Sequence, residues 1–439
     1  MNTINDIGIE IPKVLLPRTD IELDKWAVIA CDQFTSEPQY WQSVEQIVGA
    51  APSTLALILP EAYLGQTDEL DRIRQIQATM RRYVTTGILQ PHEGMVYVER
   101  DVAGKRRKGL VLALDLERYD YTAGSSSLIR PTEGTIVDRL LPRIQVRQGA
   151  ELELPHILVL IDDADCTVIE PLAESKAELE VLYSFDLMRN SGHLAGYALS
   201  EALQHRAIGA LRNLAEPRAF TTKYGLTAES APLLFAVGDG NHSLAAAKAL
   251  WARSKSHVGM SHPSRFALVE VVNVHDSGLV FEAIHRVLFG LKLDLPSALA
   301  TFFGTSMVYT TVSNFQDMAR EVDAAPPEKQ RVGLVGGGTQ FAVIEITSPP
   351  SSLAVATIQA FIDQLIQAGD GQRVDYVHGM DVLHRLGLQT GNAGFYLPAL
   401  RKSDLFKSVI VDGALPRKTF SLGEARAKRF YMEARRITL

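Results

Sequence analysis

Cysteine is nearly absent from this sequence. The 439 residues include only two cysteines, Cys31 and Cys166. A disulfide scaffold would need more, so this composition excludes one and indicates a reducing compartment, which we expect to be the cytoplasm. Two thiols cannot form a zinc site by themselves, and no zinc-ligand spacing, redox-cofactor signature or catalytic triad is present.

Long apolar runs and an excess of positive charge are also lacking. No run approaches the length that spans a bilayer, so we expect no membrane segment. Residues 1–8 have neither a basic start nor an apolar core, and we expect no signal peptide. The net charge of −7 argues against a broad nucleic-acid-binding surface. A small molecule is therefore the expected partner, and the sequence leaves open whether the chain forms a homo-oligomer.

What is present is an ordinary globular composition. Hydrophobic residues make up 46% and charged residues 22% of the chain, as in soluble proteins. One hydrophobic core rarely serves 439 residues, so we expect two domains. A polar stretch near Gly290 suggests a boundary there. It would separate a catalytic-like α+β domain, 1–290, from a C-terminal α/β domain with a basic tail, 291–439.

The apolar periodicity predicts both helices and strands, without a regular alternation. Strands outnumber what repeated βαβ units would supply, which favours an α+β fold around a mixed sheet with flanking helices. The expected helices are 68–86, 197–215, 297–303, 315–322 and 352–368. The expected strands are 26–30, 95–100, 109–114, 157–161, 233–237, 266–274, 330–335 and 340–346. A basic hairpin tip at 101–108 and a glycine turn at 336–338 are expected between strands.

The most informative segment is the turn at 238–243. A buried strand runs into Gly238-Asp239-Gly240, and an alanine-rich helix follows. The first N–H groups of a helix have no intrahelical partner, so this arrangement suits a phosphate or carboxylate. Four polar side chains lie in this turn, namely Asp239, Asn241, His242 and Ser243. The alternative is a structural turn in which Asp239 or Asn241 caps the helix.

A second candidate segment is 125–143. Arg130, Thr132 and Glu133 lie in a loop, and Thr135 is a plausible N-cap for a following helix that carries Arg139 and Arg143. Arginine suits phosphate because its planar fork donates two parallel hydrogen bonds. Glu133 could act as a general base or hold a metal. The alternative is a surface loop with ordinary ion pairs.

Two further groups of cations are candidates. His285 and Arg286 lie on an apolar element, where an adjacent pair suggests an anion site and a lone histidine a core residue. Basic residues also gather in the last part of the chain, from Arg417 and Lys418 onward. For that tail, a functional patch and a solvated terminal helix are equally compatible with the sequence.

Several of these segments, in this order, resemble the family catalogued as domain of unknown function 1015. The family's Asp-Gly-His-His-Arg turn is similar to Asp239-Gly240-Asn241-His242-Ser243. Its other recurrent segments resemble residues 131–135 with 138–139, 282–286, 376–378 and 416–420. The resemblance covers nearly the whole chain. It is specific because all of these segments occur in the same order along the chain.

The resemblance implies a phosphotransferase, distantly similar to free-serine kinases on a ParB/sulfiredoxin-like core. The donor would be ATP, ADP or pyrophosphate, with Mg²⁺, and the acceptor a small alcohol such as L-serine. By this resemblance Gly240, Asn241, His242 and Ser243 would hold phosphate, and Asp239 would orient the turn or bind Mg²⁺. Glu133 is the first candidate base and Asp32 the second. The negative charge of the transferred phosphoryl group would be neutralised by Arg130, Arg139, Arg286 and Lys418.

The sequence departs from the family pattern inside the turn. Asn241 replaces the first histidine and Ser243 the arginine, so one titratable group and one fixed charge are missing. The early Pro-Pro-Tyr-Asp segment appears as 30–33, which keeps Asp32 without the prolines. Two alternatives to a kinase therefore stay open. One is an inactive phosphate-binding regulatory protein, and the other is a ParB-like nucleotide hydrolase or DNA-binding protein.

Overall fold

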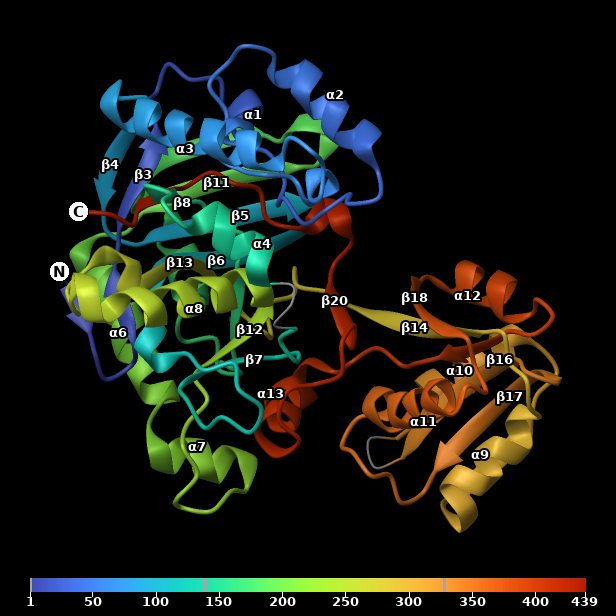
Figure 1. The fold of residues 1–439 in the computed structure, drawn as a ribbon. Coiled ribbons are helices and arrows are strands. Elements are labelled where there is room, and N and C mark those ends of the chain that lie inside the picture. Colours follow the sequence, from blue (N-terminus) through green and yellow to red (C-terminus); the bar gives the residue numbers. More distant parts are fainter. Residues whose placement is uncertain (1, 137–139, 327–328) are drawn as a thin grey trace. The chain divides into compact units, whose positions relative to one another are not determined.

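The fold was obtained as a computed structural model that describes residues 2–136, 140–326 and 329–439. The chain forms two compact units (Figure 1). The first consists of Met1–Val280 with Leu422–Leu439, and the second of Phe281–Ser421. The observed division differs from the expected one near Gly290, because the tail returns to the first unit and does not stay with the second.

The first unit contains a mixed sheet with helices on both faces. The strands of this unit are β1 (Asn2–Ile4), β2 (Ile9–Ile11), β3 (Lys13–Pro17), β4 (Leu89–Glu93), β5 (Val96–Val102), β6 (Lys105–Asp115), β7 (Ile129–Pro131), β8 (Leu152–Glu153), β9 (Leu158–Ile161), β10 (Glu180–Asp186), β11 (His193–Ala198), β12 (Phe235–Asp239), β13 (Phe266–Asn273) and β21 (Arg435–Arg436). Of these, β3 pairs with β4 and β8 with β21 in two small sheets apart from the mixed sheet. Its helices are α1 (Leu23–Trp26), α2 (Pro38–Val48), α3 (Glu69–Thr85), α4 (Leu140–Arg147), α5 (Glu170–Glu174), α6 (Glu201–Leu214), α7 (Pro217–Tyr224) and α8 (Asn241–Val258).

The second unit has its own sheet, with strand order β15-β17-β16-β19-β14-β18. The strands are β14 (Phe281–Phe289), β15 (Met307–Thr311), β16 (Gln330–Gly336), β17 (Thr339–Ile346), β18 (Arg373–His378) and β19 (Ala393–Tyr396), and the chain leaves the unit within β20 (Phe420–Leu422). The helices are α9 (Leu295–Phe303), α10 (Phe315–Asp323), α11 (Ala354–Ala368), α12 (Met380–Gly387) and α13 (Lys402–Val411). The α+β class predicted from the sequence is confirmed.

Both faces of the main sheet are buried. Its strand order is β10-β11-β5-β6-β13-β9-β12-β7. Side chains alternate along β6, so that Leu110 and Leu112 join the core under α6 and α8, whereas Val111 joins the core under α2 and α3. A strand buried on both faces needs apolar residues at every position, which explains the continuous apolar runs in the sequence.

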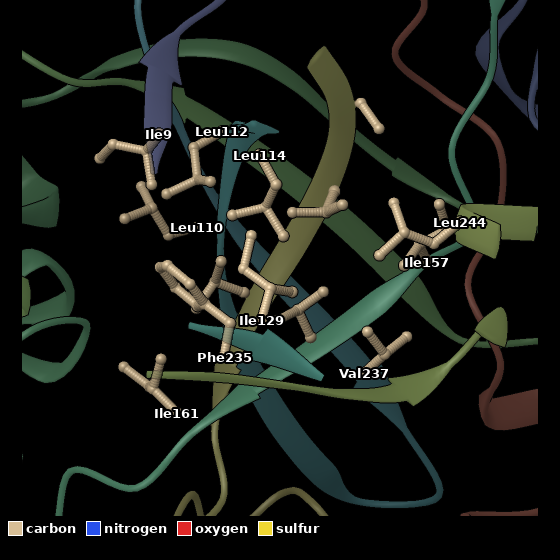
Figure 2. Close-up of a cluster of buried hydrophobic side chains, with 14 of the residues drawn as sticks. Ile9, Leu110, Leu112, Leu114, Ile129, Ile157, Ile161, Phe235, Val237 and Leu244 are labelled. Atoms are coloured by element: carbon tan, nitrogen blue, oxygen red, sulfur yellow. The ribbon is translucent and has the colours of Figure 1, made fainter. Parts of the chain in front are cut away.

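The core under α8 fixes the end of β12 where the candidate turn begins. Figure 2 shows side chains from β2, β6, β7, β9, β12 and α8 meeting in one cluster. Ile157, Val237 and Leu244 belong to it and are at most 5% exposed. Each such side chain contributes about 1.5–3 kcal/mol through burial. The strand–turn–helix unit is therefore anchored from both sides of the turn.

Most predicted elements are present, with shifted ends, but three expectations are wrong. Residues 26–30 form no strand, because Ile29 makes only an isolated bridge to Phe430. The turn expected at 101–108 is only Ala103-Gly104, whose positive φ values of 50° and 74° let β5 and β6 continue on both sides. The helix expected after Thr135 is present as α4, but Thr135 is not its N-cap, because Ile136 is not helical.

The C-terminal segment 428–437, which we call the strap, is extended and largely buried in the first unit. Phe430 and Tyr431 belong to the core under α2 and α3, and Ala434 bridges Leu15. Lys428, Arg429 and Arg435 are at most 8% exposed. The alternative of a solvated terminal helix is therefore wrong, since Lys428, Arg429 and Arg435 have partners inside the protein.

In the part of the chain that the structure describes, no helix has both the length and the apolar character needed to cross a membrane.

Candidate functional site

The turn between β12 and α8 is built as the sequence predicts. Gly240 has a φ of 75°, and a Cβ atom there would come within 3.0 Å of the Ile157 backbone, so glycine is required. The Gly240 N–H donates to Asp239 Oδ1 at 3.0 Å. Gly240 is also the N-cap of α8, and within the described part of the chain no side chain caps this helix. The alternative in which Asp239 or Asn241 caps the helix is therefore wrong, and the first N–H groups have no side-chain cap among the described residues.

The sheet brings the second candidate segment to the same edge. β7 is parallel to β12, with Ile129 opposite Phe235 and Pro131 opposite Val237. Residues that follow β7 therefore lie beside those that end β12. Glu133 follows β7 directly and is half-buried. The two segments that the sequence singled out thus meet at one sheet edge.

Thr132 and Arg130 hold this edge together. The Thr132 hydroxyl donates to the Val237 carbonyl at 2.8 Å. The Arg130 guanidinium donates to the carbonyls of Ser127 and Ala231 at 2.7 and 3.0 Å, and burial lowers its pKa. In this structure the N–H groups of the Arg130 guanidinium donate to backbone carbonyls of the protein. Arg139 lies outside the described residues.

His156 is the central side chain of the site. It precedes β9, which is antiparallel to β12, so it reaches the same edge. Its Nε2 atom lies 3.2 Å from Ser243 Oγ and 3.8 Å from Asp32 Oδ2. Its Nδ1 atom lies 2.8 Å from the Tyr431 hydroxyl. When Tyr431 donates to Nδ1, the imidazole proton is on Nε2, which faces Ser243 and Asp32.

Tyr431 and Cys31 both stay protonated. Burial raises the pKa of Tyr431 well above its usual value, and burial raises the pKa of the Cys31 thiol to about 12. The Cys31 N–H donates to the Tyr431 oxygen at 3.2 Å, which leaves the tyrosine proton for another acceptor. Neither group supplies an anion near neutral pH, so the ionised group beside His156 is Asp32.

Asp32 is a largely buried carboxylate that remains ionised. Burial by itself raises its pKa, but His156, a hydrogen bond from Gln33, Lys428 and Arg143 together lower the pKa below its usual value. The Gln33 amide donates to Asp32 Oδ1 at 2.9 Å. An ionised carboxylate next to an imidazole can accept a proton from a hydroxyl, which is what a general base does.

Lys428 supplies positive charge between the two carboxylates of the site. Its Nζ atom donates to Asp239 Oδ2 at 3.0 Å, and its charge also lowers the pKa of Asp32. Both oxygens of Asp239 therefore have donors, namely Gly240 N–H and Lys428. The described residues contain no group of three or more acidic, histidine or cysteine side chains able to hold a metal. The donor set does not fit a Mg²⁺ site at Asp239, and we derive no step through a metal.

The hydrogen bonding of three polar side-chain atoms next to the turn bears on what could bind there. His242 Nε2 accepts from the Ile136 N–H at 3.4 Å, which links α8 to the segment after β7. Asn241 Oδ1 and Thr135 Oγ1 are buried atoms that find no hydrogen-bond partner among the described residues. Buried polar atoms normally have partners, so these two mark a place where a bound polar group would fit.

A cavity of about 140 Å³ opens beside this site. His156, Ser243, Tyr431 and Cys31 line one part of it. The remaining lining is mostly apolar and comes from α3, α4, the segment 57–64 and β13. Two ion pairs reach it, Arg143 with Glu61 and Arg147 with Glu153. A molecule in this cavity would touch the residues around His156 directly.

The other sequence candidates belong to the second unit. His285 is buried there, its Nδ1 accepts from the Leu397 N–H at 3.1 Å, and burial with the charge of Arg286 lowers its pKa to about 4. Arg286 is fully buried and donates to Gln359 and to the carbonyls of Ile284 and Arg417. Lys418 is exposed, with a φ of 58°. The described contacts of His285 and Arg286 are those of core residues.

Three important residues escaped the sequence analysis. His156 carried a weak signal, because it immediately precedes a predicted buried strand. Lys428 was visible only as one of many cations in the tail. Nothing in the sequence indicated Tyr431, because its position at the site depends on the strap lying next to the segment 29–31. Asp32 was a secondary candidate that the structure places beside His156.

The family described as protein of unknown function (DUF1015) matches residues 15–365 of the chain. No protein with a curated description matches it. Solved structures show distant similarity only. A conserved hypothetical protein from Pyrococcus furiosus is 12% identical, with 75% of this chain and 95% of that chain covered and a TM-score of 0.34.

Two further structures are similar at the same level. A mutant free serine kinase in complex with AMP is 11% identical, with 75% of this chain and 92% of that chain covered and a TM-score of 0.37. SbnI from Staphylococcus aureus, truncated at its C-terminus, is 12% identical, with coverage of 74% and 81% and a TM-score of 0.32.

Proposed function

The chain belongs to the DUF1015 family, and from this premise and the geometry of the turn we propose that it is a phosphotransferase. It transfers a phosphoryl group from a nucleotide or pyrophosphate to the hydroxyl of a small metabolite. One observation carries the proposal. The ionised Asp32 and Ser243, in the first turn of the uncapped helix α8, lie 3.8 and 3.2 Å from His156 Nε2, so a proton acceptor would be adjacent to a phosphate site.

The donor phosphate would bind at the start of α8. The N–H groups of the first turn and the positive end of the helix dipole favour an anion there. Lys428 adds a cation on the side of Asp239. Asn241 Oδ1 and Thr135 Oγ1 could accept hydrogen bonds from a protonated phosphate oxygen or from water around it. Phosphoryl transfer depends chiefly on such positioning and charge neutralisation.

The acceptor hydroxyl would lie between His156 and Asp32. Its proton passes to the Asp32 carboxylate while its oxygen forms a bond to the terminal phosphorus of the donor. The bond between that phosphorus and the bridging oxygen breaks, and the leaving group departs as ADP, AMP or phosphate, according to whether the donor is ATP, ADP or pyrophosphate. His156 orients Ser243 and the hydroxyl through its Nε2 atom. Asp32 thereby takes the role for which the sequence favoured Glu133.

The first test is a thermal-shift screen with pyrophosphate, ADP and ATP, each with and without Mg²⁺, followed by ³¹P NMR with candidate alcohols. A donor that binds the folded state raises the melting temperature by mass action. We expect a shift with at least one donor and a new phosphate-monoester resonance. Absence of any shift at millimolar donor would contradict the proposal.

A further inference from the structure

The cavity beside His156 differs in character from the charged turn next to it. Leu57, Met80, Leu152 and Leu268 line it and are at most 3% exposed. Ala246, from the second turn of α8, faces it with 1% exposure. Its polar lining consists of His156, Ser243 and Tyr431 at one part and of two ion pairs elsewhere. The cavity is thus an apolar chamber with a polar end at the residues that would activate a hydroxyl.

The charged residues that reach this chamber are already paired with one another. Arg143 pairs with Glu61, while Arg147 pairs with Glu153 at 2.6 Å. Glu153 also accepts from Arg435 and from the Leu268 N–H. A zwitterion such as free serine would have to break an ion pair or leave its own charges in apolar surroundings, and both are costly.

We propose that the acceptor of this chain is an alcohol with a hydrocarbon body of about six carbons, seated in this cavity with its hydroxyl at His156. The inference rests on the proposed phosphotransferase function and names its substrate class. A comparable apolar cavity of about 150 Å³ in another protein takes up benzene. The present cavity, at about 140 Å³, has room for a ring or branched chain of that size.

The position of the cavity favours the acceptor over the nucleobase of a donor. His156 and Ser243 are part of its wall. In a nucleotide, a ribose and at least one phosphate separate the base from the transferred group. A base in this chamber would therefore bring its ribose, not its terminal phosphate, to His156. A primary alcohol instead places its oxygen directly beside Nε2.

The reaction balances with no additional reactant. The alcohol oxygen bonds to the terminal phosphorus, its proton moves to Asp32, and the donor's bridging P–O bond breaks. The products are a phosphate monoester with an apolar body and the shortened donor.

The test measures binding without any donor. Benzyl alcohol and cyclohexylmethanol, with L-serine and adenosine as comparison ligands, are titrated into the full chain by calorimetry. We expect the two apolar alcohols to bind at least about tenfold more tightly than L-serine or adenosine. Ala246→Leu and Val146→Phe fill the cavity from α8 and α4, and each should weaken alcohol binding at least about tenfold. Ala252→Leu, at an exposed position of the same helix, should leave it unchanged.

The outcomes separate this inference from the proposed function. Donor binding and phosphorylation of L-serine, without binding of either apolar alcohol, would overturn the inference and leave the phosphotransferase standing. Tight adenosine binding that both filling variants abolish would assign the cavity to the donor and also overturn it. Alcohol binding without any donor binding would support the cavity assignment while contradicting the phosphotransferase. Circular dichroism of each variant verifies that it folds.

Discussion

Asp32 shows how single residues set the chemistry of this site. Its carboxylate is largely buried, and burial opposes ionisation. His156, Gln33, Lys428 and Arg143 more than offset that effect, so its pKa lies below the usual value. A base of this kind is ionised throughout the neutral range. Proton acceptance should therefore not limit the reaction until the pH falls below about 4.

The first prediction concerns the identity of the base. Asp32→Asn keeps the shape of the side chain and removes the proton acceptor, so turnover should fall about 10²–10⁴-fold with donor binding retained. Glu133→Gln should reduce turnover by less than about tenfold, because the proposed base is Asp32, whose Oδ2 atom lies 3.8 Å from His156 Nε2. Steady-state rates and donor thermal shifts of both variants are the measurements. A greater loss in Glu133→Gln than in Asp32→Asn would restore Glu133 as the base.

The second prediction concerns the buried His285 in the second unit. Its pKa of about 4 in the folded chain is lower than the roughly 6.5 of an unfolded histidine. Below pH 6.5 the unfolded state therefore binds more protons, and the stability of the second unit should fall as the pH drops from about 6.5 towards 4. The expected loss is about 1–3 kcal/mol.

Hydrogen exchange of peptides from β14 and β19, measured between pH 7 and 5 with correction for the intrinsic exchange rate, tests this stability loss. His285→Asn offers a matched comparison, because an amide oxygen can accept the Leu397 hydrogen bond without titrating. The pH dependence should flatten in this variant. An unchanged slope would show that another group is responsible.

At the scale of elements, the turn between β12 and α8 depends on backbone geometry. Gly240 combines a positive φ with close contact to Ile157, and Asp239 accepts its N–H. The helix then begins without a side-chain cap, which leaves its first N–H groups available. Val237 and Leu244 fix the turn from both sides within the core. If an anion binds here as proposed, the turn is already organised to receive it.

The third prediction uses the two ends of α8 as a matched pair. Gly240→Ala strains a left-handed residue and also collides with Ile157, so it should cost about 1–3 kcal/mol and remove donor binding. Gly259→Ala, at the C-terminal end, has a φ of 82° and open space around it. Its backbone, with φ 82° and ψ 163°, should also be strained by alanine at a cost of about 1–3 kcal/mol, but donor binding should stay intact. Urea unfolding and donor thermal shifts compare the two variants, and an equal loss of donor binding would contradict the specific role of the turn.

At the scale of the whole molecule, the strap completes the first unit. Arg429 donates to Glu270 and Glu433, each at 2.7 Å, and Arg107 also pairs with Glu270. These four side chains are nearly inaccessible to solvent. The Ala30 N–H donates to the Arg429 carbonyl, so the same segment positions Asp32, while Lys428 and Tyr431 flank Arg429 in sequence. Removing one charge from such a network leaves another buried charge uncompensated.

The fourth prediction follows from this network. Arg429→Met should destabilise the chain by about 3–5 kcal/mol, because Glu270 and Glu433 lose a shared partner. Arg436→Met removes only an exposed pair with Glu151 and should cost less than about 1 kcal/mol. Chemical denaturation monitored by tryptophan fluorescence reports on the first unit, which contains all three tryptophans. Similar losses in the two variants would show that the buried network does not determine stability.

The sequence by itself determined what is local. The run 233–237, the glycines of the turn and the alanine-rich segment after it predict a strand, a turn and a helix, because each depends on periodicity and backbone freedom over a few residues. The same holds for α3, α10 and the β16–β17 hairpin. The candidate phosphate site at Asp239 to Ser243 could therefore be located without a structure, although its partners could not.

Only the tertiary structure decided which distant residues meet at that turn. His156 reaches it because β9 is antiparallel to β12, and Asp32, Lys428 and Tyr431 reach it because the strap bridges Ile29. Such contacts depend on strand order and on segments up to 400 residues apart. No local pattern encodes them, since the same sequence of a strand or tail is compatible with many pairings. For that reason the sequence left open whether the cations of the tail form a functional patch or a solvated helix, whereas in the structure Lys428, Arg429 and Arg435 are buried in the first unit.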